Sequence, residues 1–184
     1  MNLLPYSGLR AYLLGAVPPD ASSEGRWSVA RTLFDRSAGT RGTFTGVVIF
    51  SGNDGGGLRF REEGTVRWPA GSGETFTGPA TREYLLVPTA SPDALDMTFP
   101  DGRPFHRMSF TPEASQDRHW CDPDTYRVTY TLLGPDRFSY VWDVTGPRKD
   151  LLLESVLRRQ PGASPWPARG QRRTAGGSGD KLGS

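Results

Sequence analysis

The chain has 184 residues, of which 22 are Lys or Arg and 20 are Asp or Glu, so its formal net charge is only +2. The two signs of charge are interspersed, and this argues against a nucleic-acid-binding protein. Cys121 is the single cysteine, which rules out a disulfide within the chain and is typical of a reducing compartment, so we expect a cytoplasmic protein. No apolar stretch is long enough to span a bilayer, so we expect no membrane partner.

The first segment of the chain predicts a short helix followed by a linker, over residues 1–24. An amphipathic helix is expected over about residues 7–14, with Leu9, Leu13 and Ala16 on one face and Gly15 ending it. The linker into the first strand covers about residues 18–25. Such a helix commonly plugs one end of a β-barrel, because an open end would expose apolar lining.

The middle of the chain, residues 25–160, is predicted to form a β-barrel domain. Aromatic residues, Thr, Val, Gly and Pro are frequent and helix-forming runs are scarce, which favours an all-β fold. Alternating or apolar runs predict strands at residues 27–35, 43–50, 58–62, 65–68, 74–77, 81–87, 94–99, 103–110, 125–133, 137–144 and 151–159.

Tight turns between these runs indicate an antiparallel up-and-down barrel. Glu63-Gly64 is a hairpin signal, and Asp101-Gly102 and Gly134-Pro135-Asp136 are further turn sequences. Closing the sheet would remove its exposed edges. A β-sandwich is the competing architecture. Residues 161–184 are rich in Gly, Ser and Arg without an apolar period, so we expect a disordered tail there.

The two ends of the strand-rich region carry a Trp and an Arg. Gly25-Arg26-Trp27 opens the first strand, and Arg158-Arg159 ends the last. This pairing resembles the signature of lipocalin-type barrels, in which an Arg from the last strand covers a Trp at the start of the first. The resemblance implies a lipocalin-like barrel that encloses a cavity. We assign Trp27 and Arg159 to structural closure through a cation–π contact.

Three polar motifs lie between residues 101 and 150. They are Asp101-Gly102-Arg103-Pro104-Phe105-His106, His119-Trp120-Cys121-Asp122-Pro123-Asp124-Thr125-Tyr126 and Trp142-Asp143-Val144-Thr145-Gly146-Pro147-Arg148-Lys149-Asp150. With these motifs the chain resembles, over roughly residues 8–159, a family of small bacterial and fungal proteins of uncharacterised function, for which a calycin-like barrel is expected. The family pattern also includes Glu62 and Arg82 with Tyr84, whereas Leu157 stands where a Tyr is expected and residues 18–23 are an insertion.

Strand periodicity places several aromatic and basic residues on the inner face. Buried charges must be paired or must face water or a ligand, so such an interior suits an amphipathic or aromatic anion. We therefore predict a small-molecule-binding barrel, as a monomer or homodimer, without cofactor or metal. The predicted ligand-binding residues are Arg82, Tyr84, Arg103, His106, His119, Tyr126, Tyr130, Tyr140, Trp142, Arg148 and Lys149.

Other functions remain open from the sequence. A cofactor-free isomerase, cyclase or hydrolase would draw its catalytic residues from His106, His119 and Tyr126. A haem-binding barrel would use either histidine as the axial ligand. His119, Cys121 and Asp124 offer metal donors, but structural zinc usually takes four ligands in recognisable pairs. Each histidine also has a purely structural interpretation.

Overall fold

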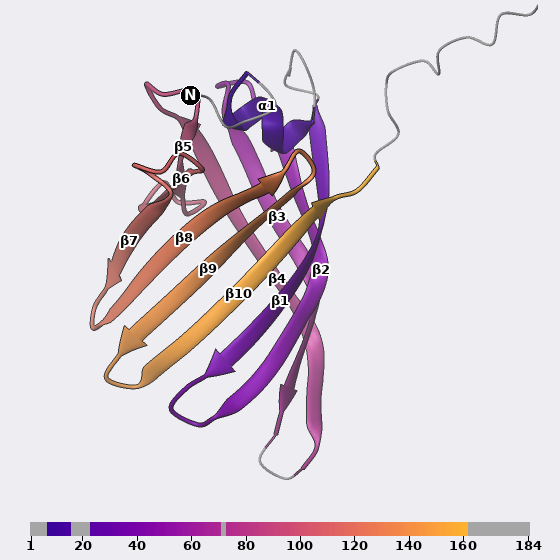
Figure 1. Cartoon of the computed structure of the whole chain (residues 1–184), viewed down its shortest axis with the longest axis vertical. Coiled ribbons are helices and arrows are strands. Elements are labelled where there is room, and N and C mark those ends of the chain that lie inside the picture. Colours follow the sequence, from indigo (N-terminus) through magenta and orange to yellow (C-terminus); the bar gives the residue numbers. More distant parts are fainter. Residues whose placement is uncertain (1–6, 16–22, 71–72, 162–184) are drawn as a thin grey trace, which may run out of the picture.

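A computed structural model describes residues 7–15, 23–70 and 73–161 of the chain. In these ranges lie one helix, α1 (Leu9–Leu14), and ten strands (Figure 1). The strands are β1 (Glu24–Asp35), β2 (Thr40–Gly52), β3 (Leu58–Pro69), β4 (Thr75–Pro88), β5 (Ala94–Thr98), β6 (Pro104–Ser109), β7 (Gln116–Cys121), β8 (Asp124–Gly134), β9 (Arg137–Gly146) and β10 (Lys149–Arg159). In the described part of the chain, no helix is long and apolar enough to cross a membrane.

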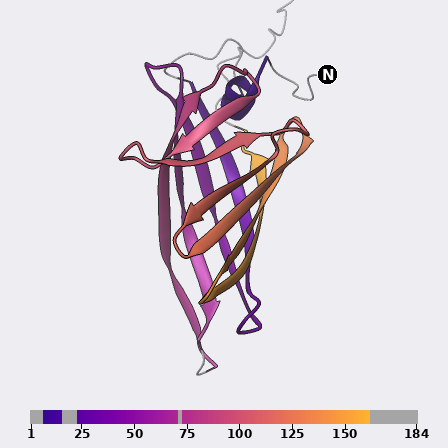
Figure 2. The ribbon, with the colours of Figure 1, turned by 90° about the vertical axis from the view of Figure 1, so that its left-hand side faces the viewer.

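The strands form a single antiparallel sheet that curls into a barrel. Its order is β6-β5-β4-β3-β2-β1-β10-β9-β8-β7, so sequential strands are neighbours and β1 joins β10. The predicted up-and-down, lipocalin-like barrel with a short N-terminal helix is confirmed. Closure is incomplete, because β6 and β7 form the two ends of the sheet order (Figure 2). Across this seam the Arg107 backbone N–H donates to the Asp117 carboxylate.

The helix and the first and last strands close one end of the barrel (Figure 1). Trp27 pairs with Arg159 across β1 and β10, and the Arg159 guanidinium carbon lies 4.2 Å from the Trp27 ring centroid. The Trp27 indole N–H donates to the Leu13 carbonyl at 2.9 Å, and Arg159 Nη2 donates to the Tyr12 carbonyl at 2.6 Å. Helix α1 ends at Leu14 and is followed by Gly15, which adopts φ 69°, as expected for a helix-terminating glycine.

Several predicted features lie outside the described residues: Ala16, most of the linker and the tail from residue 162.

Four aromatic rings fill the interior of the barrel next to α1: Tyr12, Trp27, Phe110 and Phe138. Their ring centroids lie 5.0–5.6 Å apart in the pairs Trp27–Phe138, Tyr12–Trp27, Phe110–Phe138 and Tyr12–Phe110. This core anchors the helix on the barrel. The hollow part of the interior is therefore farther from the helix.

The predicted hairpin at Glu63-Gly64 is wrong, because β3 runs without a break through these residues. Gly64 lies directly opposite Gly46 on β2. A Cβ atom on Gly64 would meet the Gly46 Cα and the Phe44 ring, each at 2.7 Å. The glycine thus serves close strand approach rather than a turn. Likewise, the strands predicted at residues 74–77 and 81–87 are one strand, β4, which begins at Thr75, and the sequence did not predict the short polar strand β7.

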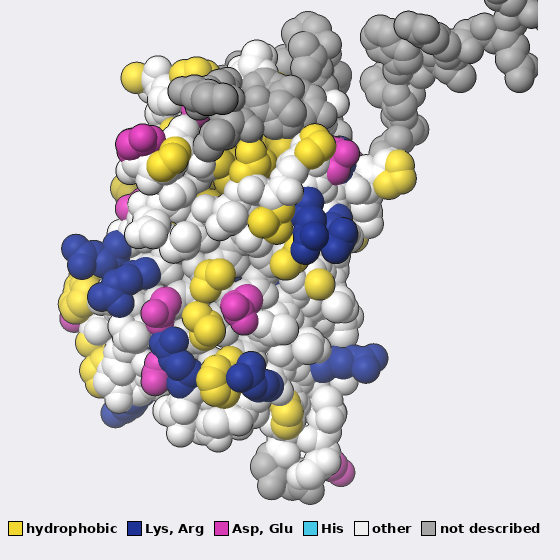
Figure 3. All heavy atoms as spheres, viewed as in Figure 1, with side chains coloured by type: hydrophobic (Ala, Val, Ile, Leu, Met, Phe, Trp, Pro, Cys, Tyr) yellow, Lys and Arg dark blue, Asp and Glu magenta, His cyan; other side chains and the backbone are white. Residues whose placement is uncertain are grey.

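The surface carries no large field of either sign on the face seen in Figure 3, where basic and acidic side chains are interspersed. Many charged side chains of the described residues form exposed pairs, such as Arg59 with Glu83 at 2.7 Å and Arg107 with Asp96 at 2.7 Å. Exposed pairs of this kind contribute little to stability. The chemically distinctive side chains lie inside the barrel instead.

Candidate ligand-binding cavity

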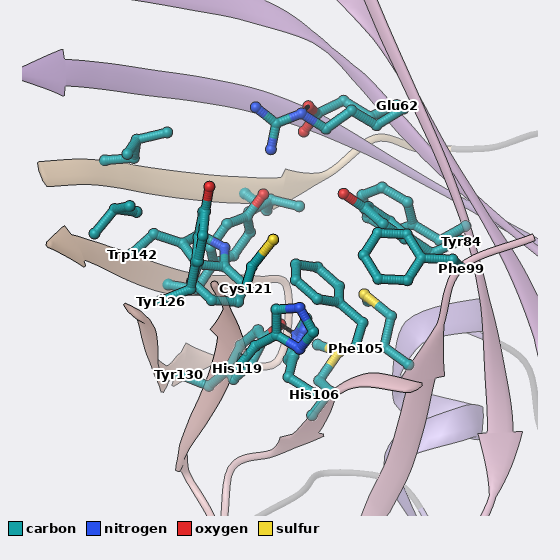
Figure 4. Close-up of a pocket in the computed structure, with 18 of the residues that line it drawn as sticks. Glu62, Tyr84, Phe99, Phe105, His106, His119, Cys121, Tyr126, Tyr130 and Trp142 are labelled. Carbon is teal, nitrogen blue, oxygen red and sulfur yellow. Dashed lines mark hydrogen bonds and ion pairs between the residues drawn. The ribbon is translucent and has the colours of Figure 1, made fainter. Parts of the chain in front are cut away.

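The barrel encloses a cavity of about 380 Å³, within the range of small-molecule sites (Figure 4). Its wall is mostly aromatic and apolar, with a few polar side chains. The lining residues lie on β2–β10, except for Phe99, which follows β5. They are Phe50, Phe60, Glu62, Arg82, Tyr84, Met97, Phe99, Phe105, His106, Met108, His119, Cys121, Tyr126, Tyr130, Phe138, Tyr140, Trp142, Val144, Leu151, Leu153 and Leu157.

The structure brings most of the predicted ligand-binding residues into this lining: Arg82, Tyr84, His106, His119, Tyr126, Tyr130, Tyr140 and Trp142. The other three predicted residues lie outside it. Arg103 is exposed and pairs with Asp101 at 2.7 Å, and Arg148 is exposed in the turn between β9 and β10. Lys149 Nζ lies 2.6 Å from Asp124 Oδ2 and donates to the Tyr126 hydroxyl at 3.1 Å.

A buried ion pair that the sequence did not predict adjoins the lining. Arg31 and Glu62 are 3% and 2% exposed, and they share two hydrogen bonds of 2.9 and 2.6 Å. Arg31 also donates to the hydroxyls of Tyr140 at 2.6 Å and Ser155 at 2.8 Å. Burial lowers the Arg31 pKa, but electrostatic interactions and hydrogen bonds with Tyr140 and Glu62 outweigh this effect and raise it. Arg31 lies on the inner face of β1 with Trp27, because alternate residues of a strand point to the same face. This spacing in the sequence could have indicated that Arg31 is buried.

Arg82 stands at the solvent-facing side of the same group. Its side chain is 42% exposed, and its Nε lies 3.7 Å from Glu62 Oε1, farther than a hydrogen bond. Glu62 already accepts from Arg31 with both oxygens. The Arg82 guanidinium therefore presents N–H donors to the cavity that Glu62 does not satisfy.

The cavity opens to solvent beside Arg82. Strand β5 pairs with β4 only over residues 85–88, so no described strand covers residues 75–84 on that side. Cys121 on β7 is exposed although it lines the cavity. His119 and Tyr126, which line the same region, are half-buried. The mouth is thus formed by β4, β7 and β8.

His106 and Tyr130 form the second polar group, deep in the cavity. His106 Nε2 lies 2.7 Å from the Tyr130 hydroxyl, and the two rings are stacked at 5.9 Å. His106 Nδ1 is buried, and among the described residues it has no hydrogen-bond partner. Burial lowers the His106 pKa to about 4, so the imidazole is neutral near pH 7. A neutral ring can offer a donor or an acceptor at Nδ1, depending on the tautomer.

The hydroxyls of three cavity tyrosines are also neutral near pH 7. Burial raises the pKa values of Tyr84, Tyr130 and Tyr140. A general base works best when its pKa is near the operating pH, which His106 does not meet. The arrangement therefore favours hydrogen bonding to a ligand over proton transfer. In the described part of the chain, no group of three or more His, Cys, Asp or Glu residues is placed to hold a metal ion.

The fold and the cavity define a class: an antiparallel, lipocalin-like barrel with a ligand-sized interior. Residues 24–159 match the model of the Family of unknown function (DUF6314), and the chain belongs to that family. None of the curated proteins compared with the chain matches it.

Solved structures similar to this chain include an S-type phycobiliprotein lyase, CPES, from Guillardia theta, with a TM-score of 0.46 and 10% identity over 75% of this chain and 88% of that one. A second is EF1p2_mFAP2b bound to DFHBI, with a TM-score of 0.39 and 15% identity over 81% and 98% of the two chains. A third is a redesigned β-barrel, b11L5F_LGL, with a TM-score of 0.36 and 19% identity over 84% and 99%.

Proposed function

We propose that the barrel binds a small amphipathic or aromatic anion in its interior. The observation that carries the proposal is the position of Arg82, a partly exposed guanidinium in an aromatic wall whose nearest carboxylate, Glu62, is already bonded twice to Arg31. A guanidinium binds carboxylate and phosphate groups through paired, charge-assisted hydrogen bonds. An anionic head group at Arg82 would leave the apolar part of the ligand against the rings.

The charges around the cavity support an anion rather than a cation. Arg31 and Glu62 neutralise each other, whereas Arg82 adds one positive charge that lacks an equally close partner. Lys149, near the mouth, is matched by Asp124, whose hydrogen bond raises the Lys149 pKa. The deeper polar atoms are neutral, so the ligand would carry its charge at the mouth.

A direct test is isothermal titration with 2-naphthoate and with its neutral analogue 2-naphthamide. We expect the acid to bind more tightly, and Arg82→Gln to weaken its binding by about 10- to 100-fold, the range for loss of a charged hydrogen bond. Arg67→Gln, which removes an exposed arginine on the outer face of β3, is the matched control and should leave binding unchanged. Equal binding of the acid and the amide would reject the proposal. Native mass spectrometry of the purified protein would reveal a ligand that co-purifies.

A cofactor-free enzyme is the second candidate, and the 2.7 Å contact between His106 and Tyr130 favours it. Both groups line the cavity and could orient a reacting carbonyl or hydroxyl. The low pKa of His106 makes binding the better-supported function. Mass analysis of a bound ligand before and after long incubation separates the two, because only an enzyme would change its mass or isomeric form.

The proposal also includes a cytoplasmic protein that acts as a monomer or homodimer, without a nucleic-acid partner. The single cysteine and the net charge of +2 support these assignments. Light scattering after gel filtration measures the oligomeric state, and a mass above that of a dimer would contradict it.

A further inference from the structure

Phe105 points into the barrel because of a β-bulge. In the register between β5 and β6, Met97 pairs with His106 and Thr98 with Pro104, so Phe105 has no residue opposite it. Neighbouring residues of a regular strand point to opposite faces, and a bulge re-aims a side chain. As a result, Phe105 and His106 both line the cavity although they are adjacent in sequence.

The re-aimed ring sits in an aromatic slot. Phe105 is stacked on Tyr84, with centroids 5.2 Å apart and planes at 22°, and on Trp142 at 5.3 Å and 14°. Figure 4 shows it between these two rings near the middle of the cavity. His106 stands nearly perpendicular to Phe105, at 4.5 Å and 82°, so its buried imidazole borders the same slot. A flat aromatic ligand in this position could stack on Tyr84 on one side and on Trp142 on the other.

The strand that carries Phe105 is weakly held. Strand β6 spans Pro104–Ser109, pairs with β5 on one side and forms no ladder with β7 on the other. The seam is bridged by the contact from the Arg107 backbone N–H to Asp117. Segments with few ladder hydrogen bonds open at lower free energy than the rest of a fold. Phe105 can therefore leave its slot without disrupting the closed part of the barrel.

We infer that Phe105 occupies the position of the ligand's ring and that a flat, ring-bearing anion displaces it from between Tyr84 and Trp142. The inference rests on the proposed function and names its substrate class: aromatic or conjugated ring acids rather than chain acids. The acid group binds at Arg82, and a polar ring substituent bonds to the His106 Nδ1 that has no partner among the described residues. Phe105 is thus the residue that determines specificity.

The test compares wild type with Phe105→Ala in titrations with 2-naphthoate and decanoate. Wild type must break the stacking of Phe105 on Tyr84 and on Trp142 when the ligand binds, whereas Phe105→Ala has no such contacts to break. The variant therefore binds 2-naphthoate about tenfold more tightly, which is the size expected for two stacking contacts. Decanoate affinity changes by less than about threefold, since a flexible chain gains little from a flat slot. Phe76→Ala, which removes a 58% exposed ring of β4 outside the lining, is the control and leaves both affinities unchanged.

A loss of 2-naphthoate affinity in Phe105→Ala, or no change, overturns the inference. If Phe105 is a fixed wall, Phe105→Ala binds 2-naphthoate more weakly than wild type or equally well, while the charge dependence at Arg82 persists and the proposed function stands. If charge and Arg82 have no effect on binding, the proposed function itself fails.

Should Phe105→Ala not fold, Phe105→Leu, which keeps much of the volume without an aromatic face, takes its place in both titrations. Wild-type protein gives an independent readout by NMR. Overhauser contacts from naphthoate protons to the rings of both Tyr84 and Trp142 support the displacement, and undiminished contacts between Phe105 and Trp142 in the complex overturn it.

Discussion

Arg31 and Glu62 form a bidentate ion pair inside the barrel, with N···O distances of 2.9 and 2.6 Å. Arg31 reaches past β2, where its guanidinium carbon lies 5.0 Å from the Phe44 ring centroid, and so links β1 to β3. The Tyr140 and Ser155 hydroxyls extend the link to β9 and β10. One hydrogen-bonded group therefore connects strands that are far apart in the sequence.

Removing one partner of this pair should destabilise the protein strongly. We expect Arg31→Met to lower the free energy of unfolding by about 3–5 kcal/mol, because the buried Glu62 carboxylate loses both hydrogen bonds from Arg31 and keeps only Arg82 Nε, 3.7 Å away. The double variant Arg31→Met/Glu62→Leu should recover most of the loss, since no buried charge remains. Urea unfolding of the single and double variants measures the difference. A single variant as stable as wild type would contradict the role given to the pair.

His106 should make stability depend on pH in a defined window. Its pKa falls from 6.5 to about 4 on burial, so the unfolded chain binds the proton more readily. The stability that the folded protein owes to a neutral His106 is fully present above pH 6.5 and is lost as the pH falls toward 4. The shift corresponds to about 3 kcal/mol.

The measurement compares wild type with His106→Gln, which cannot titrate here, in urea unfolding at pH 7.5 and pH 4. Wild type should lose about 3 kcal/mol more than the variant over this interval. Carboxylates titrate in both proteins, so the difference between them isolates the histidine. If wild type and His106→Gln lose the same unfolding free energy between pH 7.5 and pH 4, His106 is not buried as a neutral imidazole.

Trp27→Ala should lower the free energy of unfolding by about 3–5 kcal/mol, as for a large core truncation. Trp27 is fully buried, packs on Tyr12 and Phe138, and donates its indole N–H to Leu13. Trp120→Ala, at a 63% exposed site on β7, is the control and should change stability by less than about 0.5 kcal/mol. Thermal unfolding followed by circular dichroism compares the three proteins.

Gly64→Ala should destabilise the protein, although alanine is a small residue that most positions accept. The new methyl group would meet the Phe44 ring and Gly46 Cα, so β2 and β3 would have to separate. Gly102→Ala is a useful contrast, because a Cβ there meets nothing within 4 Å and only the φ of 87° opposes it. If packing governs the Gly64 site, Gly64→Ser should be at least as harmful as Gly64→Ala, whereas a turn position would tolerate serine.

Strand periodicity and turn sequences predicted the barrel, and eight of the eleven predicted ligand-binding residues line the cavity. Alternation along β8 and β9 places Tyr130, Tyr140 and Trp142 inside, because successive side chains of a strand point to opposite faces. The same rule failed at Phe105, since the bulge in β6 depends on its pairing with β5. The turn signal failed at Glu63-Gly64, because a glycine required by close strand contact looks the same in the sequence as one required by a turn.

Local sequence by itself determined the strand character of the chain and the helix that stops before Gly15, because backbone preference and side-chain alternation act within a few residues. The contact between Trp27 and Arg159 was instead implied by the resemblance to lipocalin-type barrels. Only the tertiary structure decided which charges pair. Arg31 joins Glu62 from a strand 31 residues away, and this leaves Arg82 facing the cavity. Electrostatic partnership depends on distance in space, and strand order and register set that distance.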